Sequence, residues 1–214
     1  MHFNKNDKIG SYTVAFPHKQ GSYAETYRVK DQNGKTQFLK LINYSKLNRN
    51  QFDDDGRVIE IEIAKRLKHH NLCQLIESGS MMMNGGQFAW FVTEFVSGET
   101  LSQRIIRDDN ISVYDIKVIA KAVLSALSFL HSQPTPIIHN EVTIQNVLLN
   151  LTAGFQDLKL IDFGNACFLD QHPVKLHLNE FNPFYLAPER FSGVSSVQAD
   201  LYSVGVMMYH LLYG

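Results

Sequence analysis

The sequence predicts an α+β fold, in which a β-rich first part is followed by a mainly helical second part. Short runs of β-branched and aromatic residues, separated by turn-forming residues, fill the first part and are typical of strands. Apolar residues at helical spacing fill the second part. The chain has 214 residues, 44% of them hydrophobic, and a net charge of −1, which is ordinary for a globular protein of one large domain or two small lobes.

The strands of the first part are predicted from composition and from the turns that separate them. Asp31-Gln32-Asn33-Gly34 is a strong hairpin signal, because Asn and Gly tolerate positive φ. Met81 to Gly86 is interpreted as a loop tip. Five strands are therefore expected, at 11–16, 23–30, 36–43, 72–77 and 88–95.

Three helices are predicted from apolar periodicity. The first runs from Val58 to Leu67 and follows an acidic segment, which favours a helix N-terminus. The second covers 113–130 and ends before two prolines. The third, 201–212, is apolar nearly all round and is expected to be buried on every side. We expect one lobe at 1–96 and another at 97–214, joined near Ser97-Gly98.

Several classes of protein are disfavoured by composition. Met1–Gly10 is polar and does not resemble a signal peptide, and no apolar run reaches the roughly 18 residues of a membrane span. The near-neutral charge gives no support for binding nucleic acid or a membrane surface. Cys73 and Cys167 have no metal or redox spacing, so a reducing, cytoplasmic compartment is expected.

One ordered set of motifs predicts the function. His139 to Asn146 is followed by Asp162-Phe163-Gly164, by Ala187-Pro188-Glu189 and by Asp200. Each motif alone is weak, but the order and spacing resemble a eukaryotic-type protein kinase domain, close to the Ser/Thr type, over essentially the whole chain. The resemblance implies a bilobal fold with a β-rich N-lobe that carries one helix, and a mainly helical C-lobe that here lacks its last helices.

The resemblance also implies a role for particular residues. Lys40 corresponds to the phosphate-binding lysine and Glu60 to its ion-pair partner, while Asn146 and Asp162 correspond to the two Mg²⁺ ligands. Glu141 stands at the position of the catalytic base. The implied ATP-binding residues are Gly21, Ser22, Tyr23, Ala24, Phe38, Lys40, Thr93, Glu94, Val96 and Leu148.

The chain departs from the family pattern at linked positions. Glu141 replaces an aspartate, Asn140 an arginine that reads a phosphate, and Thr143 a lysine that neutralises the transferred phosphate. Phe38 replaces an alanine that contacts adenine; its ring either intrudes on the adenine site or is turned aside by a shift of the strand. Only Gly21 remains of three loop glycines, and residues 162–189 contain no Ser or Thr, so no phosphorylation switch is expected there.

Three functions are compatible with this pattern. The favoured one is a pseudokinase or impaired kinase that acts as a regulatory and binding module. The second is an active atypical protein kinase with Glu141 as base. The third, a small-molecule phosphotransferase, fits the Ala187-Pro188-Glu189 motif and Asp200 less well. We also expect a protein partner, a further domain or an oligomer mate to cover the helix at 201–212.

Overall fold

The computed structural model describes residues 1–107, 111–169 and 181–214, which form two compact units. Met1–Lys65 and Gln74–Phe95 make the first unit; Arg66–Cys73 and Val96–Gly214 make the second. Strands dominate the first unit and helices the second, which is the α+β arrangement that the sequence predicts.

A short segment of the first half of the chain belongs to the second unit. The Asn71 carbonyl accepts a hydrogen bond of 2.8 Å from the backbone N–H of Leu160, and the Asn71 side chain donates one of 2.9 Å to the carbonyl of Leu158. These bonds attach residues 66–73 to a strand of the second unit, which periodicity along the chain could not reveal.

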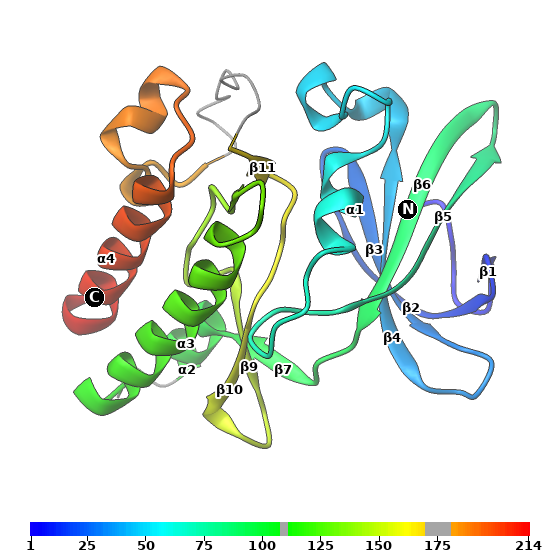
Figure 1. Ribbon diagram of the computed structural model, residues 1–214. Coiled ribbons are helices and arrows are strands. Elements are labelled where there is room, and N and C mark those ends of the chain that lie inside the picture. Colours follow the sequence, from blue (N-terminus) through cyan, green and yellow to red (C-terminus); the bar gives the residue numbers. More distant parts are fainter. Residues whose placement is uncertain (108–110, 170–180) are drawn as a thin grey trace. The chain divides into compact units, whose positions relative to one another are not determined.

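The first unit is built on one antiparallel six-stranded sheet with the order β1-β2-β3-β4-β6-β5 (Figure 1). A single short helix, α1, packs on it, and two 3-10 turns cover Tyr44–Lys46 and Arg49–Gln51. The bounds are β1 (Lys8–Ile9), β2 (Tyr12–Gln20), β3 (Ala24–Lys30), β4 (Thr36–Asn43), β5 (Leu75–Met83), β6 (Gly86–Glu94) and α1 (Ile59–Ala64).

Strand alternation gives this sheet two different faces. On one face Leu39 and Leu41 of β4 pack with Trp90 in a buried cluster. On the other face Ile42 packs with Ile61 of α1 in a second cluster. Because side chains alternate, Phe38 and Lys40 project on the same face as Ile42, the face that α1 covers.

Two sequence predictions are wrong in the first unit. The helix expected to reach Leu67 ends at Ala64, since the chain then leaves the sheet for the second unit. Met81 and Met83 lie within β5 rather than in a loop tip, and both pack on the buried cluster around Trp90. The turn is formed by the two residues after β5, Asn84-Gly85, whose φ angles of 52° and 75° suit a two-residue hairpin.

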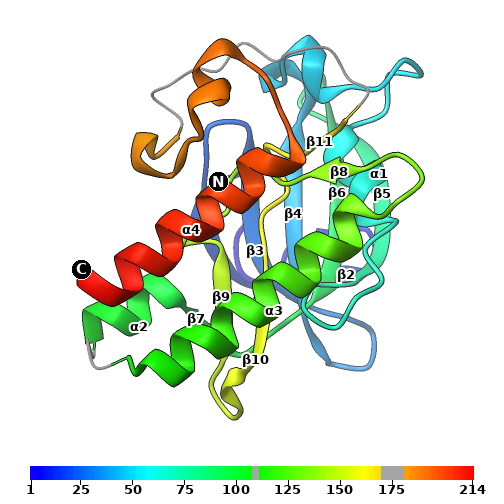
Figure 2. The same cartoon turned by 60° about the vertical axis from the view of Figure 1, so that its left-hand side comes forward.

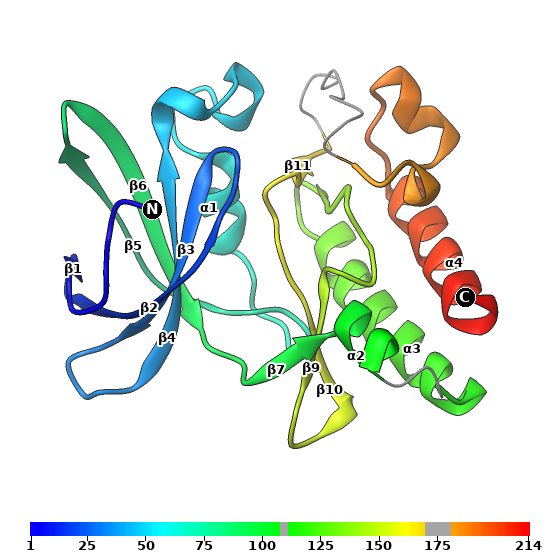
Figure 3. The same cartoon turned by 180° about the vertical axis from the view of Figure 1, so that it is seen from behind.

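The second unit combines helices with small sheets. In Figure 2 α3 and α4 run side by side, and in Figure 3 the sheet β10-β9-β7 lies next to α2 and α3. Two 3-10 helices span Pro183–Tyr185 and Pro188–Ser192. The bounds are α2 (Leu101–Arg107), α3 (Val113–His131), α4 (Val197–Tyr213), β7 (Gly98–Thr100), β8 (Ile137–Ile138), β9 (Val147–Asn150), β10 (Gly154–Leu160) and β11 (Cys167–Phe168).

The last helix is covered on one side only. Val204 and Met207 of α4 are buried, but Leu212 is exposed and Leu211 is half-buried. One side of α4 packs on α3 and on the 3-10 helix Pro183–Tyr185, and within the described ranges nothing covers the opposite side. Sequence periodicity could not show which side is covered, because the helix is apolar on both sides. Across the described part of the chain, no helix has the length and apolar character needed to cross a membrane.

Candidate active site

In the first unit an ion pair joins β4 to α1. The Nζ of Lys40 lies 2.6 Å from Oε1 of Glu60, and the side chains are only 12% and 7% exposed. Lys40 is positioned by the strand register, in which it lies opposite Thr26 of β3 and Phe91 of β6. A buried charge pair of this kind holds an ammonium group in a defined place, as binding of a phosphate group requires.

The remnant of the glycine-rich loop connects β2 and β3. The backbone N–H of Gly21 donates to the carbonyl of Ala24 at 2.8 Å, and the N–H of Asn43 donates to the carbonyl of Tyr23 at 3.0 Å. Between these bonds Ser22 stands at the turn. The loop is thereby closed as a tight hairpin, and the Tyr23 side chain reaches Lys40 and Glu60.

Phe38 lies two residues before Lys40 on the same face of β4. Its ring centroid lies 5.8 Å from that of His18 in an edge-to-face arrangement, and its strand neighbours in register are Arg28 and Thr93. Burial, assisted by the charge of Arg28, lowers the pKa of His18, so this neighbour is a neutral ring at physiological pH. The aromatic pair is therefore on the lysine side of the strand, and the strand is not shifted to turn the benzyl group away.

The remaining residues proposed for ATP binding are divided between the units. Thr93 and Glu94 end β6 in the first unit, where the N–H of Glu94 donates to the carbonyl of Gln74 at 3.2 Å. Val96 begins a stretch of the second unit, and Leu148 lies in β9 of that unit.

In the second unit Asp200 organises the loop that follows β8. Its carboxylate is 1% exposed and accepts hydrogen bonds from the backbone N–H groups of His139, at 2.9 Å, and of Asn140, at 2.8 Å. Its Oδ2 also accepts from Nε2 of His131 at 2.9 Å. Asn140 has a φ of 64°, so the loop makes a sharp left-handed step at the point that Asp200 holds.

Glu141 is held at both its backbone and its side chain. Asn146 donates from Nδ2 to the Glu141 carbonyl at 2.9 Å, and Asn165 donates from Nδ2 to Oε2 of Glu141 at 3.0 Å. Because the amide nitrogen of Asn146 donates to this carbonyl, its amide oxygen is the atom that could serve as a ligand to a cation. Asn165 and His131 were not identified from the sequence, where no spacing or motif marks them.

Asp162 begins the turn after β10 with a φ of 65°. Its Oδ1 accepts from the N–H of Gly164 at 3.3 Å, and the ring of Phe163 packs at 4.9 Å from that of His139. His139 accepts at Nδ1 from the N–H of Glu141 and donates from Nε2 to the carbonyl of Ile161. Burial lowers the pKa of His139, and these contacts fit the neutral tautomer, so its place is structural.

Two of the altered positions are buried and uncharged. The Oγ1 of Thr143 has no hydrogen-bond partner within the described residues, and no ammonium group replaces the family lysine at that point. Asn140 donates from Nδ2 to the Asn165 carbonyl at 3.0 Å and to Sγ of Cys167 at 3.3 Å. Burial raises the pKa of the Cys167 thiol, which lowers the fraction present as the nucleophilic thiolate. The stretch in which no phosphorylation switch is predicted includes residues 170–180, which lie outside the described residues.

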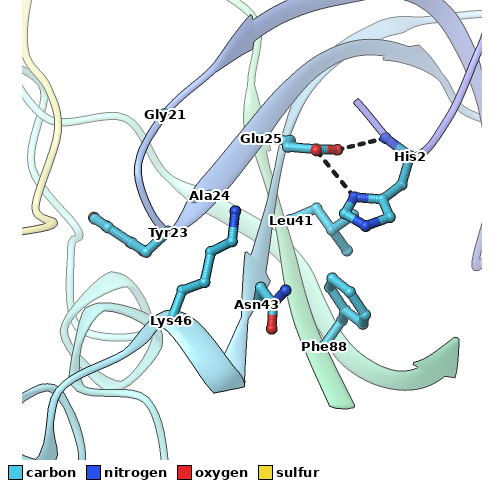
Figure 4. Close-up of a pocket in the computed structure, with 9 residues that line it drawn as sticks. All are labelled: His2, Gly21, Tyr23, Ala24, Glu25, Leu41, Asn43, Lys46 and Phe88. Carbon is cyan, nitrogen blue, oxygen red and sulfur yellow. Dashed lines mark hydrogen bonds and ion pairs between the residues drawn. The ribbon is translucent and has the colours of Figure 1, made fainter. Parts of the chain in front are cut away.

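A small pocket in the first unit lies beside the hairpin that joins β2 and β3. Figure 4 shows Glu25 and His2 joined by hydrogen bonds of 2.8 and 2.9 Å, with Phe88 beside them. The pocket has room for about a single water molecule. Its lining lacks Lys40 and Phe38, so we do not assign nucleotide binding to it. The lining residues are His2, Gly21, Tyr23, Ala24, Glu25, Leu41, Asn43, Lys46 and Phe88.

Comparison with known proteins identifies the family. A family model described as "Protein kinase domain" matches residues 19–214, so the chain belongs to the protein kinase domain family. Domains of this family generally use ATP and Mg²⁺. The Lys40–Glu60 pair fits a phosphate, and Asn146 with Asp162 fits Mg²⁺, which needs only one or two carboxylates beside phosphate oxygens. Accordingly, no cluster of three metal-binding side chains occurs within the described ranges.

The curated relatives are kinases of greater length. The chain is 33% identical over 200 residues to the serine/threonine-protein kinase TIO of Arabidopsis thaliana, matching 91% of this chain and 14% of that protein. It is 28% identical to calcium-dependent protein kinase 5 of Plasmodium berghei, with 91% and 33% covered. It is 26% identical to CBL-interacting protein kinase 8 of Oryza sativa, with 97% and 45% covered. The chain thus spans less than half the length of each of these relatives.

Proposed function

We propose that this protein kinase domain is a pseudokinase, or a strongly impaired kinase, that acts as a regulatory and binding module. The observation that carries the proposal is the position of Phe38. In the family that the sequence resembles, this position carries a small side chain that contacts adenine. Here an aromatic ring lies on the Lys40 face of β4 against His18. A ring at this point obstructs adenine and weakens nucleotide binding.

The altered catalytic loop supports the same proposal. A general base must meet the substrate proton within about 3 Å, and an error of about 1 Å costs on the order of 100-fold in rate. Glu141 is one methylene longer than the family aspartate, and one of its oxygens accepts from Asn165. Thr143 carries a neutral hydroxyl where the family has a lysine, so this side chain supplies no positive charge to stabilise the transferred phosphate.

The retained groups support residual contact with nucleotide and metal. Lys40, oriented by Glu60, would bind phosphate oxygens, and Asn146 and Asp162 would hold Mg²⁺, which neutralises phosphate charge when bound. These residues also favour the alternative function, an active atypical protein kinase in which Glu141 takes the proton of a protein hydroxyl. The small-molecule phosphotransferase is disfavoured by the match to the protein kinase domain family.

Nucleotide binding is tested by thermal shift with saturating Mg-ATP on the wild type, Phe38→Ala and Phe16→Ala, which alters an exposed phenylalanine of β2. A ligand at 100 times its Kd adds about 2.7 kcal/mol, which corresponds to about 5–10 °C in a domain of this size. We expect a shift of this order only for Phe38→Ala. A large shift in the wild type would contradict the proposal.

Phosphate transfer is tested by radiolabelled autophosphorylation and by transfer to a generic protein substrate. Asp162→Ala is the control, because it removes a proposed metal ligand. Transfer by the wild type that is abolished in Asp162→Ala would support the active kinase and overturn the pseudokinase. Transfer that Asp162→Ala leaves unchanged would reveal a contaminating kinase.

The proposal includes a polypeptide partner on α4. Exposed apolar and tyrosine side chains line its outward side, as is typical of protein interfaces. The proposed partner would be contradicted if the domain sediments as a monomer at high concentration and the backbone amides on this side of α4 exchange rapidly with solvent. A cytoplasmic location is also proposed, since Cys73 and Cys167 are both free thiols. The residues of the exposed side are Leu201, Tyr202, Tyr209, Leu212 and Tyr213.

A further inference from the structure

The Lys40–Glu60 ion pair has a third member from the glycine-rich loop. The Nζ of Lys40 donates to the Tyr23 hydroxyl at 3.2 Å, and that hydroxyl donates to Oε2 of Glu60 at 3.3 Å. The direct bond from Nζ to Oε1 of Glu60, at 2.6 Å, closes the triangle. The ammonium group also lies 5.2 Å from the centroid of the Tyr23 ring, within the range of a cation–π contact.

The backbone holds Tyr23 in a position to make these contacts. Its carbonyl accepts from the N–H of Asn43 at the end of β4, the strand that carries Lys40. The hydrogen bond from the N–H of Gly21 to the carbonyl of Ala24 closes the hairpin around Tyr23. In Figure 4 Tyr23 is one of the residues that line the small pocket, and its hydroxyl end points away from His2 and Glu25. The loop therefore presents the side chain to the Lys40–Glu60 ion pair.

The chemistry of the triangle has two consequences. The phenol oxygen accepts from an ammonium while its proton bonds to a carboxylate, so it stabilises both charges of a pair that is almost withdrawn from solvent. The same oxygen and ring occupy one side of Nζ. An anion that approaches Lys40 from this side must displace the phenol.

We propose that Tyr23 is a positioning residue for Lys40 and Glu60 that also competes with anionic ligands of Lys40. The glycine-rich loop thus acts as a cap on its own lysine, and opening the cap exposes the ammonium. The inference depends on the proposed phosphate-binding role of Lys40 in one respect only, which is the identity of the competing anion. The three hydrogen bonds that form the cap all lie within the first unit.

The test measures the reactivity of Lys40 without nucleotide or metal. The wild type, Tyr23→Phe and Tyr114→Phe, which changes an exposed tyrosine of α3, are treated with limiting acetic anhydride, and acetylation of Lys40 is followed by peptide mass spectrometry. Tyr23→Phe keeps the ring and removes the hydroxyl. We expect Lys40 to be acetylated about two- to tenfold faster in Tyr23→Phe, the range for loss of one hydrogen bond, with no change in Tyr114→Phe.

A second arm adds tripolyphosphate, an anion without adenine, as a protecting ligand. Half-protection of Lys40 at a lower tripolyphosphate concentration in Tyr23→Phe than in the wild type supports the competition. If Lys40 is acetylated faster in Tyr23→Phe but tripolyphosphate protects it in neither protein, the cap is supported and the phosphate-binding role of Lys40 is excluded. Equal acetylation rates in the wild type and Tyr23→Phe would overturn the inference, whatever tripolyphosphate does.

Discussion

Replacement of Asp200 by alanine would remove the acceptor that anchors the loop after β8. The carboxylate is 1% exposed and serves the N–H groups of His139 and Asn140 as well as the His131 ring. Each buried N–H left without a partner costs about 1–3 kcal/mol, so the two together cost about 2–6 kcal/mol. For a domain of this size, a loss near 4 kcal/mol lowers Tm by about 8–16 °C.

Urea unfolding followed by far-UV circular dichroism measures this loss, because α2, α3 and α4 all lie in the second unit. The single tryptophan, Trp90, is buried in the first unit, and its fluorescence reports that unit separately. Asp200→Asn retains one amide oxygen as an acceptor, so its free energy of unfolding is expected to fall less than that of Asp200→Ala. Asp115→Ala removes only the capping box of α3 and is expected to cost about 1 kcal/mol. A loss in Asp200→Ala no greater than that in Asp115→Ala would refute the anchor role.

Two further predictions concern a close backbone contact and a buried imidazole. Gly98→Ala should destabilise the second unit by about 2–3 kcal/mol in the same urea assay, because a Cβ there would lie 2.0 Å from the Leu149 carbonyl oxygen. Gly205→Ala, where a Cβ meets nothing within 4 Å, should instead stabilise α4 by about 0.5–1 kcal/mol, and a loss there would contradict this reasoning. The pKa of His139 is lowered from 6.5 in the folded state, so its stabilising contribution is present above that value and is lost as the pH falls toward the folded pKa. Tm should therefore fall less between pH 7 and pH 5 (about the range in which histidine titrates) in His139→Gln than in the wild type, and parallel profiles would exclude this cause.

The hairpins and helices could be predicted from patterns within short stretches of the sequence. The hairpin at Asp31–Gly34 forms as predicted, with Gly34 at a φ of 78° and Asp31 accepting from the N–H groups of Asn33 and Lys35. The helix predicted at 113–130 is α3, whose apolar stripe is buried. These features depend on interactions within one turn of the chain or one face of an element, so a single sequence contains the information.

Contacts between distant residues could not be predicted in the same way. Asn165 and Glu141 are 24 residues apart, and His131 and Asp200 are 69 apart. No repeat or spacing links such pairs, because they meet only when separate elements pack. The attachment of residues 66–73 to the second unit, and the one-sided burial of α4, belong to the same class.

By itself the sequence determined the α+β class, the order of the kinase motifs and the place of Phe38 and Lys40 on one predicted strand. It could do so because strand alternation and motif order are properties of the chain alone. Only the tertiary structure decided that the Phe38 ring meets His18, that Asn165 holds Glu141 and that Tyr23 closes on Lys40 and Glu60. Side-chain hydrogen bonds and ring contacts act over a few ångströms, so they exist only where folding brings their partners together.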